Sequence, residues 1–161
     1  MDRSTFDSNL QALLASANSR IPKHSLPDLP GIPARPGVPG WHEEELALWN
    51  QGEAIRQLVR TAGKKLNRTQ VAEILDICKN RNAGRGRESF VMLLGQRAYA
   101  EYAPQIAALL GDRDVGGHCV YTLYKMAAGY DTEIAPFLTH EKKWVSDYAK
   151  RYMQQYGKSH N

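Results

Sequence analysis

The sequence is poor in cysteine and has no long apolar run. Its two cysteines among 161 residues, Cys78 and Cys119, both lie in apolar helical patterns. We therefore expect buried free thiols rather than a disulfide or a reactive nucleophile. No stretch approaches the roughly 20 apolar residues that a membrane-spanning helix needs, and the first residues show no cleavable signal pattern. These absences predict a cytoplasmic protein.

Alternation of apolar and polar residues is also lacking, so no segment predicts a β-strand. Motifs for catalysis and metal binding are missing as well. His42 is followed by glutamates, but the second histidine of an HExxH zinc motif would fall at Leu46. The adjacent His118 and Cys119 point in different directions on a helix, so a catalytic pair would need a distant partner. We expect an all-α protein that is not an enzyme and that holds no metal or cofactor.

Proline is scarce outside one segment, because six of the eight prolines fall between Ile21 and Gly40. Proline fixes φ and removes a backbone donor, so this segment predicts an extended connector rather than a helix or a strand. Residues 33–36 also match the PxxP pattern of ligands that bind in a polyproline conformation. We expect residues 1–40 to hold an N-terminal helix and this connector, and residues 41–161 to form a helical solenoid, within one compact domain overall.

Helical periodicity covers the rest of the chain. The apolar stripe near the N-terminus predicts an amphipathic helix over residues 4–19, with Ser4 and Asp7 as its capping pair. Asn67 and Gln70 form a capping box for a later helix. Other helices are expected over residues 41–62, 87–98, 103–110, 115–128, 132–138 and 142–156.

Two prolines and three polar residues bear on the ends of these helices. Pro104 suits a first helical turn. Pro136 removes a hydrogen bond inside its expected helix, which should start late or be distorted. The candidate N-caps are Asp114, Asp131 and Thr139.

One pattern occurs twice between Arg85 and His140 and begins a third time. Phe90, Val91 and Leu94 match Cys119, Val120 and Leu123, and those match Tyr148, Ala149 and Tyr152, each 29 residues on. Within the units, Ile106, Leu109 and Leu110 match Ile134, Phe137 and Leu138, 28 residues on. Self-similarity at a short fixed period indicates stacked repeats.

The repeat resembles the short variants of the HEAT family. The resemblance depends on GDRD at residues 111–114 before a helix, on the apolar spacing, and on KWVSDYA at residues 143–149. It covers about residues 84–156 well and 43–80 loosely. It implies a short α-solenoid of antiparallel helix pairs, in which the first helices form the convex surface and the second helices line a concave one.

Charge differs between the two sets of helices, although the net charge is only +4. The expected first helices of the last three units are mostly basic, and the second helices are mostly acidic. These acids are solvated helix faces or a surface that attracts a basic partner. A nucleic acid fits an acidic groove poorly. The predicted partner-binding residues are Glu73, Asp76, Glu101, Asp131 and Glu133, with Tyr102 and Tyr130.

A second candidate site is the glycine-containing turn that carries Arg81, Arg85 and Arg87. Glycines beside a helix N-terminus can expose backbone N–H groups to an anion, and the arginines would add positive charge. The alternative is a basic turn without a ligand. The P-loop spacing GxxxxGK[ST] is absent here.

The chain resembles HEAT-like immunity proteins of bacterial toxin systems. That resemblance implies a monomer, or a heterodimer with a cognate toxin, and a protein that neutralises the toxin, often a basic nuclease, by covering its active site. Two other functions stay open. One is nucleic-acid binding, as in the HEAT-like DNA alkylation-repair family. The other is a scaffold, as in HEAT-like modules associated with phycobilin-lyase proteins.

Overall fold

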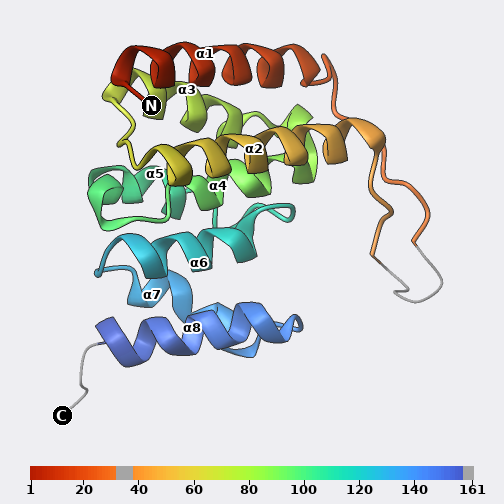
Figure 1. Cartoon of the computed structure of the whole chain (residues 1–161). Helices are drawn as coiled ribbons and strands as arrows, with labels where there is room; N and C mark the ends of the chain where they lie inside the picture. Colours follow the sequence, from red (N-terminus) through yellow and green to blue (C-terminus); the bar gives the residue numbers. More distant parts are fainter. Residues whose placement is uncertain (32–37, 158–161) are drawn as a thin grey trace. The chain divides into compact units, whose positions relative to one another are not determined.

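The computed structural model describes residues 1–31 and 38–157. Throughout these ranges the chain is helical, and its only β-type pairing is an isolated bridge between Gly31 and Pro39 (Figure 1). The all-α class is therefore confirmed. The chain divides into two compact units, Met1–Phe90 and Val91–Asn161. The boundary that the sequence predicts near residue 40 falls inside the first unit.

Each unit contains both α-helices and short 3₁₀ segments. The first unit holds α1 (Arg3–Arg20), α2 (Glu43–Ala62), α3 (Arg68–Lys79) and η1 (Arg81–Arg87), and α4 (Glu88–Leu93) begins in it. The second unit holds η2 (Arg97–Tyr102), α5 (Ala103–Ala107), α6 (Gly116–Met126), α7 (Asp131–Ile134), η3 (Ala135–Thr139) and α8 (Lys143–Tyr156). None of the helices within the described ranges is long and apolar enough to cross a membrane.

The N-terminal helix α1 packs against α2 and α3. Its apolar stripe is fully buried, as the periodicity predicts, and it consists of Phe6, Leu10, Leu14 and Ala17. The Arg3 guanidinium donates to the Lys65 carbonyl, and the Gln51 amide donates to the Leu13 carbonyl. Since Arg3 lies near the end of α2 and Leu13 near its middle, α1 and α2 run antiparallel.

The predicted cap of α1 is wrong. Asp2 is the N-cap, and its carboxylate accepts the backbone N–H of Thr5 at 2.8 Å. Ser4 already lies inside the helix, and Asp7 forms an ion pair with Arg3 at 3.1 Å. The capping box at the start of α3 is confirmed, because Asn67 and Gln70 each accept the other's backbone N–H.

Gly52 allows α2 to approach the start of α4 closely. A Cβ atom at Gly52 would lie 2.0 Å from Ser89 Oγ and 2.9 Å from the Phe90 ring. The Ser89 hydroxyl also donates to the Trp49 carbonyl at 2.9 Å. This glycine is therefore a packing requirement, and α2 continues through it without a break.

The connector is extended where it is described, as the prolines predict. Its two flanks pair with each other, since the Gly40 N–H donates to the Pro30 carbonyl at 3.2 Å. The Ser25 hydroxyl bonds to the Asn82 side chain at 3.1 Å, which attaches the connector to η1. The PxxP pattern at 33–36 lies outside the described residues.

In the second unit, α6 and α8 lie side by side and run in the same direction (Figure 1). His118 lies opposite Trp144, and Tyr121 lies opposite Tyr148. A Cβ at Gly117 would lie 2.7 Å from Val145 Cγ2, so this glycine allows the close approach of the two helices. The repeat residues that are buried in this unit are Val91, Leu94, Cys119, Val120, Leu123, Ala149 and Tyr152.

The prolines act as predicted. Pro104 lies in the first turn of α5. At Pro136 the expected helix over 132–138 is split into the single α-turn α7 and the 3₁₀ segment η3. The three candidate N-caps are wrong, because the N-caps are Val115, Tyr130 and Lys142.

A neighbouring aspartate explains one of these errors. Asp112 takes the turn before α6: its carboxylate accepts the Asp114 N–H at 2.9 Å, and its carbonyl accepts the Gly116 N–H at 2.8 Å.

Candidate functional site

The predicted acidic residues of the second unit lie on its second-helix segments. Glu101 is near the end of η2, and Asp131 and Glu133 lie in the first turn of α7. Glu101 and Glu133 are exposed, whereas Asp131 is half-buried. The negative charge of these segments thus reaches the surface.

Tyr102 and Tyr130 occupy the same position in successive repeats. They are 28 residues apart, Tyr102 is the N-cap of α5, and Tyr130 is the N-cap of α7. Both rings are half-buried. Each tyrosine is adjacent in sequence to an acid, Glu101 or Asp131. The structure therefore presents two equivalent tyrosine–acid pairs at the same end of two second helices, an equivalence that the 28-residue spacing already contains.

The other two predicted acids lie together on α3 in the first unit. Asp76 is exposed. Glu73 is half-buried, and its Oε2 atom is buried without a hydrogen-bond partner. One turn of helix separates these two residues, so they share a side of α3.

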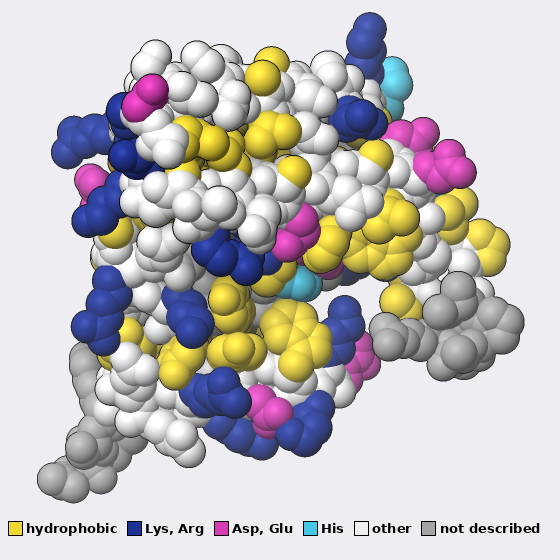
Figure 2. Space-filling model, viewed as in Figure 1, with side chains coloured by type: hydrophobic (Ala, Val, Ile, Leu, Met, Phe, Trp, Pro, Cys, Tyr) yellow, Lys and Arg dark blue, Asp and Glu magenta, His cyan; other side chains and the backbone are white. Residues whose placement is uncertain are grey.

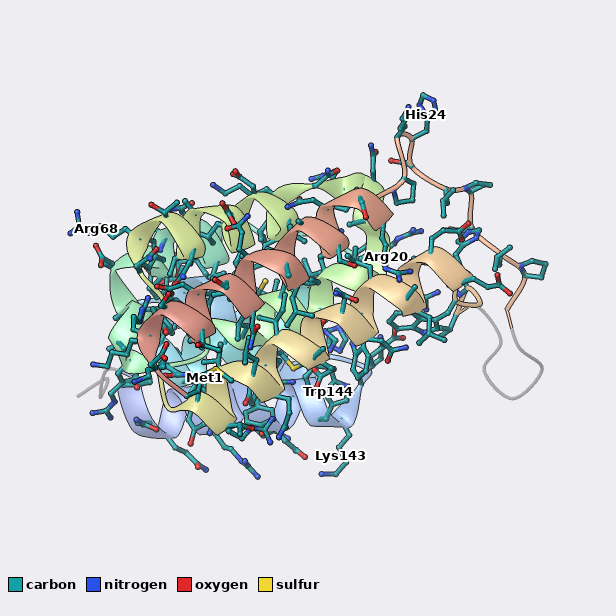
Figure 3. The ribbon with its side chains drawn as sticks, turned by 45° about the horizontal axis from the view of Figure 1, so that its top comes forward. Met1, Arg20, His24, Arg68, Lys143 and Trp144 are labelled. Atoms are coloured by element: carbon teal, nitrogen blue, oxygen red, sulfur yellow. The ribbon has the colours of Figure 1, made fainter. Side chains whose placement is uncertain are left out.

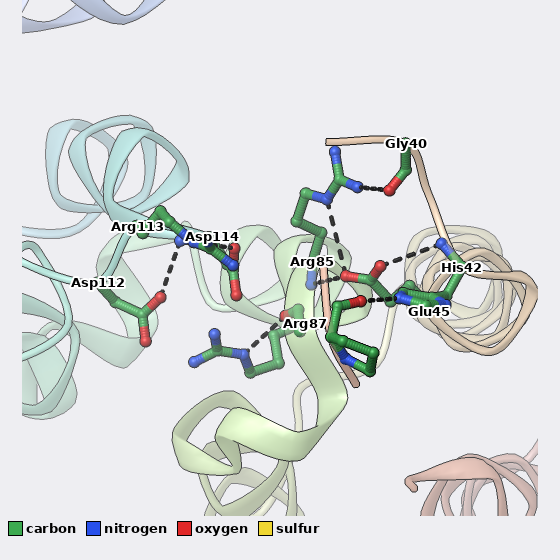
Figure 4. A network of polar contacts seen from close by, with 10 residues as sticks. Gly40, His42, Glu45, Arg85, Arg87, Asp112, Arg113 and Asp114 are labelled. Atoms are coloured by element: carbon green, nitrogen blue, oxygen red, sulfur yellow. Dashed lines mark hydrogen bonds and ion pairs between the residues drawn. The ribbon is translucent and has the colours of Figure 1, made fainter. Parts of the chain in front are cut away.

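The glycine-containing turn binds a carboxylate of the chain itself (Figure 4). Glu45 Oε2 accepts the backbone N–H of Arg85 at 2.7 Å, and Glu45 Oε1 accepts the N–H of His42 at 3.1 Å. Gly84 has a φ of +54°, and a Cβ there would lie 2.3 Å from Glu45 Oε2. The left-handed backbone and the absent side chain therefore admit the glutamate, and any external anion would have to compete with it.

The three arginines of this turn differ in their surroundings. Arg81 is exposed. The Arg85 guanidinium bonds to the Gly40 carbonyl and lies 4.5 Å from the centre of the Trp41 ring. Arg87 is buried, with 1% of its surface exposed, and donates to the Gly84 and Cys78 carbonyls. Two of the three predicted anion-binding arginines thus hold the turn and the connector in place.

Both cysteines are buried free thiols, as predicted. Burial raises the pKa of Cys78 to about 12 from an ordinary value of 9.0, although the nearby Arg87 charge lowers it. A thiol that stays protonated is a poor nucleophile. Cys78 is therefore a core residue.

Tyr152 fixes the turn between α6 and α7. Its hydroxyl donates to the Ala127 carbonyl at 2.9 Å and accepts the Tyr130 N–H at 3.0 Å. Burial raises the pKa of Tyr152 to about 12. This residue positions the backbone of Tyr130, one of the predicted contact residues, and the sequence indicated it only as a repeat position.

Aromatic and basic side chains meet along α6 and α8, and this surface is the main feature that the sequence did not predict. We call it the α6–α8 strip. Trp144 is 39% exposed, and in Figure 2 hydrophobic side chains over these helices are bordered by Lys and Arg. In Figure 3 Lys143 extends into solvent beside Trp144. The strip consists of His118, Tyr121, Tyr124, Lys125, Trp144, Tyr148 and Arg151.

The aromatic members of the strip contact one another across the two helices. His118 and Trp144 have ring centres 4.9 Å apart, and the rings of Tyr121 and Tyr148 are edge to face at 5.0 Å. The 29-residue offset between Cys119 and Tyr148 contained the register of the helices. The sequence did not show that the aromatic residues of both would share one face.

No three His, Cys, Asp or Glu side chains gather as metal ligands would anywhere in residues 1–31 and 38–157. Comparison with protein-family models, with curated proteins and with solved structures found no match.

Proposed function

We propose that this chain is a non-enzymatic protein-binding module that acts as an immunity protein. In this proposal it neutralises a cognate bacterial toxin, such as a basic nuclease domain, by covering the toxin's active site. The partner is a protein, and the working complex is a heterodimer.

The fold we propose for this role is a short HEAT-like α-solenoid. Its support is the repeat in the second unit. The helices α6 and α8 pack side by side in the same direction, and α7 with η3 lies between them in the chain and packs on α8. Helices that recur with this alternation present equivalent positions on successive units, which is how repeat proteins build extended binding surfaces.

The observation that carries the proposal is the equivalence of Tyr102 and Tyr130. Both cap a second helix, both are half-buried, and each is adjacent to an acid. Tyrosine is enriched among residues that dominate binding energy, because a ring adds large contact area with little loss of side-chain entropy. The adjacent carboxylates would surround these anchors with negative charge.

The charge of the second helices selects the kind of partner. Glu101, Asp131 and Glu133 carry like charge on neighbouring repeats, so a partner with a basic surface gains long-range attraction. The groups that would most easily serve chemistry are engaged in the fold instead. Cys78 is buried with a raised pKa, and Glu45 receives two backbone N–H groups.

The experiment is to measure association with the purified product of the gene adjacent to that of this chain. The double substitution Glu101→Lys and Glu133→Lys should slow association about tenfold or more at low salt, because steering by charge raises association rates by 10-fold to 1000-fold. The matched control is Glu44→Lys with Glu141→Lys, which makes the same change in net charge at two exposed acids outside the predicted contacts. Equal effects of the two pairs would place the interface elsewhere.

A further inference from the structure

The α6–α8 strip alternates rings and cations in a regular order. The Lys125 ammonium lies 5.8 Å from the centre of the Tyr121 ring and 5.6 Å from that of Tyr124. The Arg151 guanidinium lies 5.0 Å from the centre of the Tyr148 ring. Each cation therefore borders an aromatic pair and remains at the surface, since Lys125 and Arg151 are both exposed.

The rings form successive pairs along the two parallel helices. The first pair is His118 with Trp144, and the second is Tyr121 with Tyr148. The pairs are three residues apart on α6 and four on α8, which corresponds to about 4.5–6 Å of helix rise. Trp144 contacts α6 on one side only: a Cβ at Gly117 would lie 3.5 Å from its ring, and 39% of its surface is exposed.

The two helices also have an excess of positive charge. They contain Lys125, Lys143, Lys150 and Arg151 against a single acid, Asp147. Asp147 is paired with Lys143 at 2.6 Å. The cations Lys125, Lys150 and Arg151 therefore face solvent without an acid on their own helices to balance them.

We propose that the α6–α8 strip is a binding surface for single-stranded nucleic acid. In this arrangement a base stacks on the outward face of Trp144, and the phosphates that follow lie beside Lys125 and Arg151. The proposal concerns a surface other than the acids of the proposed function, and the two can fail independently.

A single strand fits this surface better than the alternatives do. It presents a planar base and a negative phosphate in alternation, which matches the alternation of rings and cations. An acidic peptide would satisfy the cations but offers no planar group to the exposed Trp144 ring. A duplex keeps its bases stacked inside, so it would also leave this ring unused.

The test is fluorescence anisotropy of the whole chain with labelled oligothymidylate of about ten nucleotides, a length within the range that single-strand-binding folds occupy. Trp144→Ala should weaken binding about 5-fold to 100-fold, the range reported by alanine substitution for one stacked base. The control is Trp41→Ala, because Trp41 is also 39% exposed but lies far along the chain from α6 and α8. Arg151→Glu should flatten the dependence of affinity on salt, whereas Arg60→Glu, at another exposed arginine, should not.

Two probes distinguish stacking from simple charge attraction. An abasic oligonucleotide of the same length should bind more weakly than oligothymidylate, and polyglutamate should compete poorly. Three results would overturn the proposal: equal binding of the abasic strand, equal effects of the two tryptophan substitutions, or displacement of the strand by polyglutamate at matched charge, which would identify an acidic protein as the ligand.

Discussion

Glu45 accepts the backbone N–H of Arg85 at 2.7 Å although forty residues separate them. The other oxygen of the same carboxylate accepts the N–H of His42. Glu45 is therefore both the N3 residue of a helix start and the anion bound by a glycine turn. One side chain joins the end of the connector, the first turn of α2 and η1.

Glu45→Ala should lower the free energy of unfolding by about 1–3 kcal/mol, because it leaves buried donors without an acceptor. Urea denaturation followed by circular dichroism measures the change. Glu44→Ala is the control, since Glu44 is exposed in the same helical turn. If both substitutions had the same small effect, the contact with Arg85 would not contribute to stability.

Gly52→Ala should destabilise the chain although alanine has the higher helix propensity. Propensity alone predicts a gain of about 1 kcal/mol, whereas the new methyl group would meet Ser89 and Phe90 and overpacking costs about 1–3 kcal/mol. Asn50→Ala, at an exposed position of α2, should be neutral or stabilising. A melting temperature for Gly52→Ala at or above that of the unaltered chain would contradict the close packing of α2 on α4.

Gly117→Ala tests the contact between α6 and α8 in the same way. Its methyl group would lie 2.7 Å from Val145, so the helices would have to separate. Gly111→Ala is the matched control, because a Cβ there meets nothing within 4 Å. We expect a loss of about 1–3 kcal/mol for Gly117→Ala alone, measured by urea denaturation, and equal values for the two variants would be inconsistent with the described packing.

Tyr152 should make stability depend on pH in the alkaline range. Burial raises its pKa from 10.0 to about 12, so the folded state holds the phenol proton more tightly than the unfolded state does. This contribution is complete below about pH 10 and is lost as the pH rises toward 12. Tyr152→Phe should cost about 1 kcal/mol at neutral pH through its lost hydrogen bonds and should make the alkaline decline less steep.

The control for this pH dependence is Tyr156→Phe, whose hydroxyl makes one longer bond, 3.4 Å, to the Tyr124 carbonyl. It should leave the slope of unfolding free energy against pH unchanged. A slope that is the same in Tyr152→Phe and in the unaltered chain would show that Tyr152 does not titrate in this window. Cys78 ionises over an overlapping range, so some decline remains in every variant.

Local signals in the sequence predicted the longer helices well. The apolar stripe of α1, the capping box at Asn67 and the break at Pro136 all depend on residues within a few positions of one another. Such features act within one or two turns of chain, which is why one sequence is enough to find them.

Contacts between distant residues account for most of what the sequence did not predict. The segment after α3 was expected to end the helix as a turn, but it forms η1 around Gly84, where Glu45 supplies the bound carboxylate. Arg87 was expected on a basic surface and is buried. Neither outcome has a local signal, because both depend on which segments pack together.

The candidate site shows the same division. The sequence placed Glu101, Asp131 and Glu133 on second helices, and the structure does so too. It did not identify Tyr102 and Tyr130 as N-caps, since caps at these positions usually carry a short polar side chain. The α6–α8 strip required the parallel register of two helices that lie a full repeat apart.

The most direct test of the proposed function is survival of cells that co-express this chain and the toxin domain encoded by the adjacent gene. The unaltered chain should restore growth, and the Glu101→Lys, Glu133→Lys variant should protect less at equal expression. The Glu44→Lys, Glu141→Lys control should protect fully. Absence of protection by the unaltered, folded chain would contradict the immunity function, and equal protection by both variants would contradict the role of the second-helix acids.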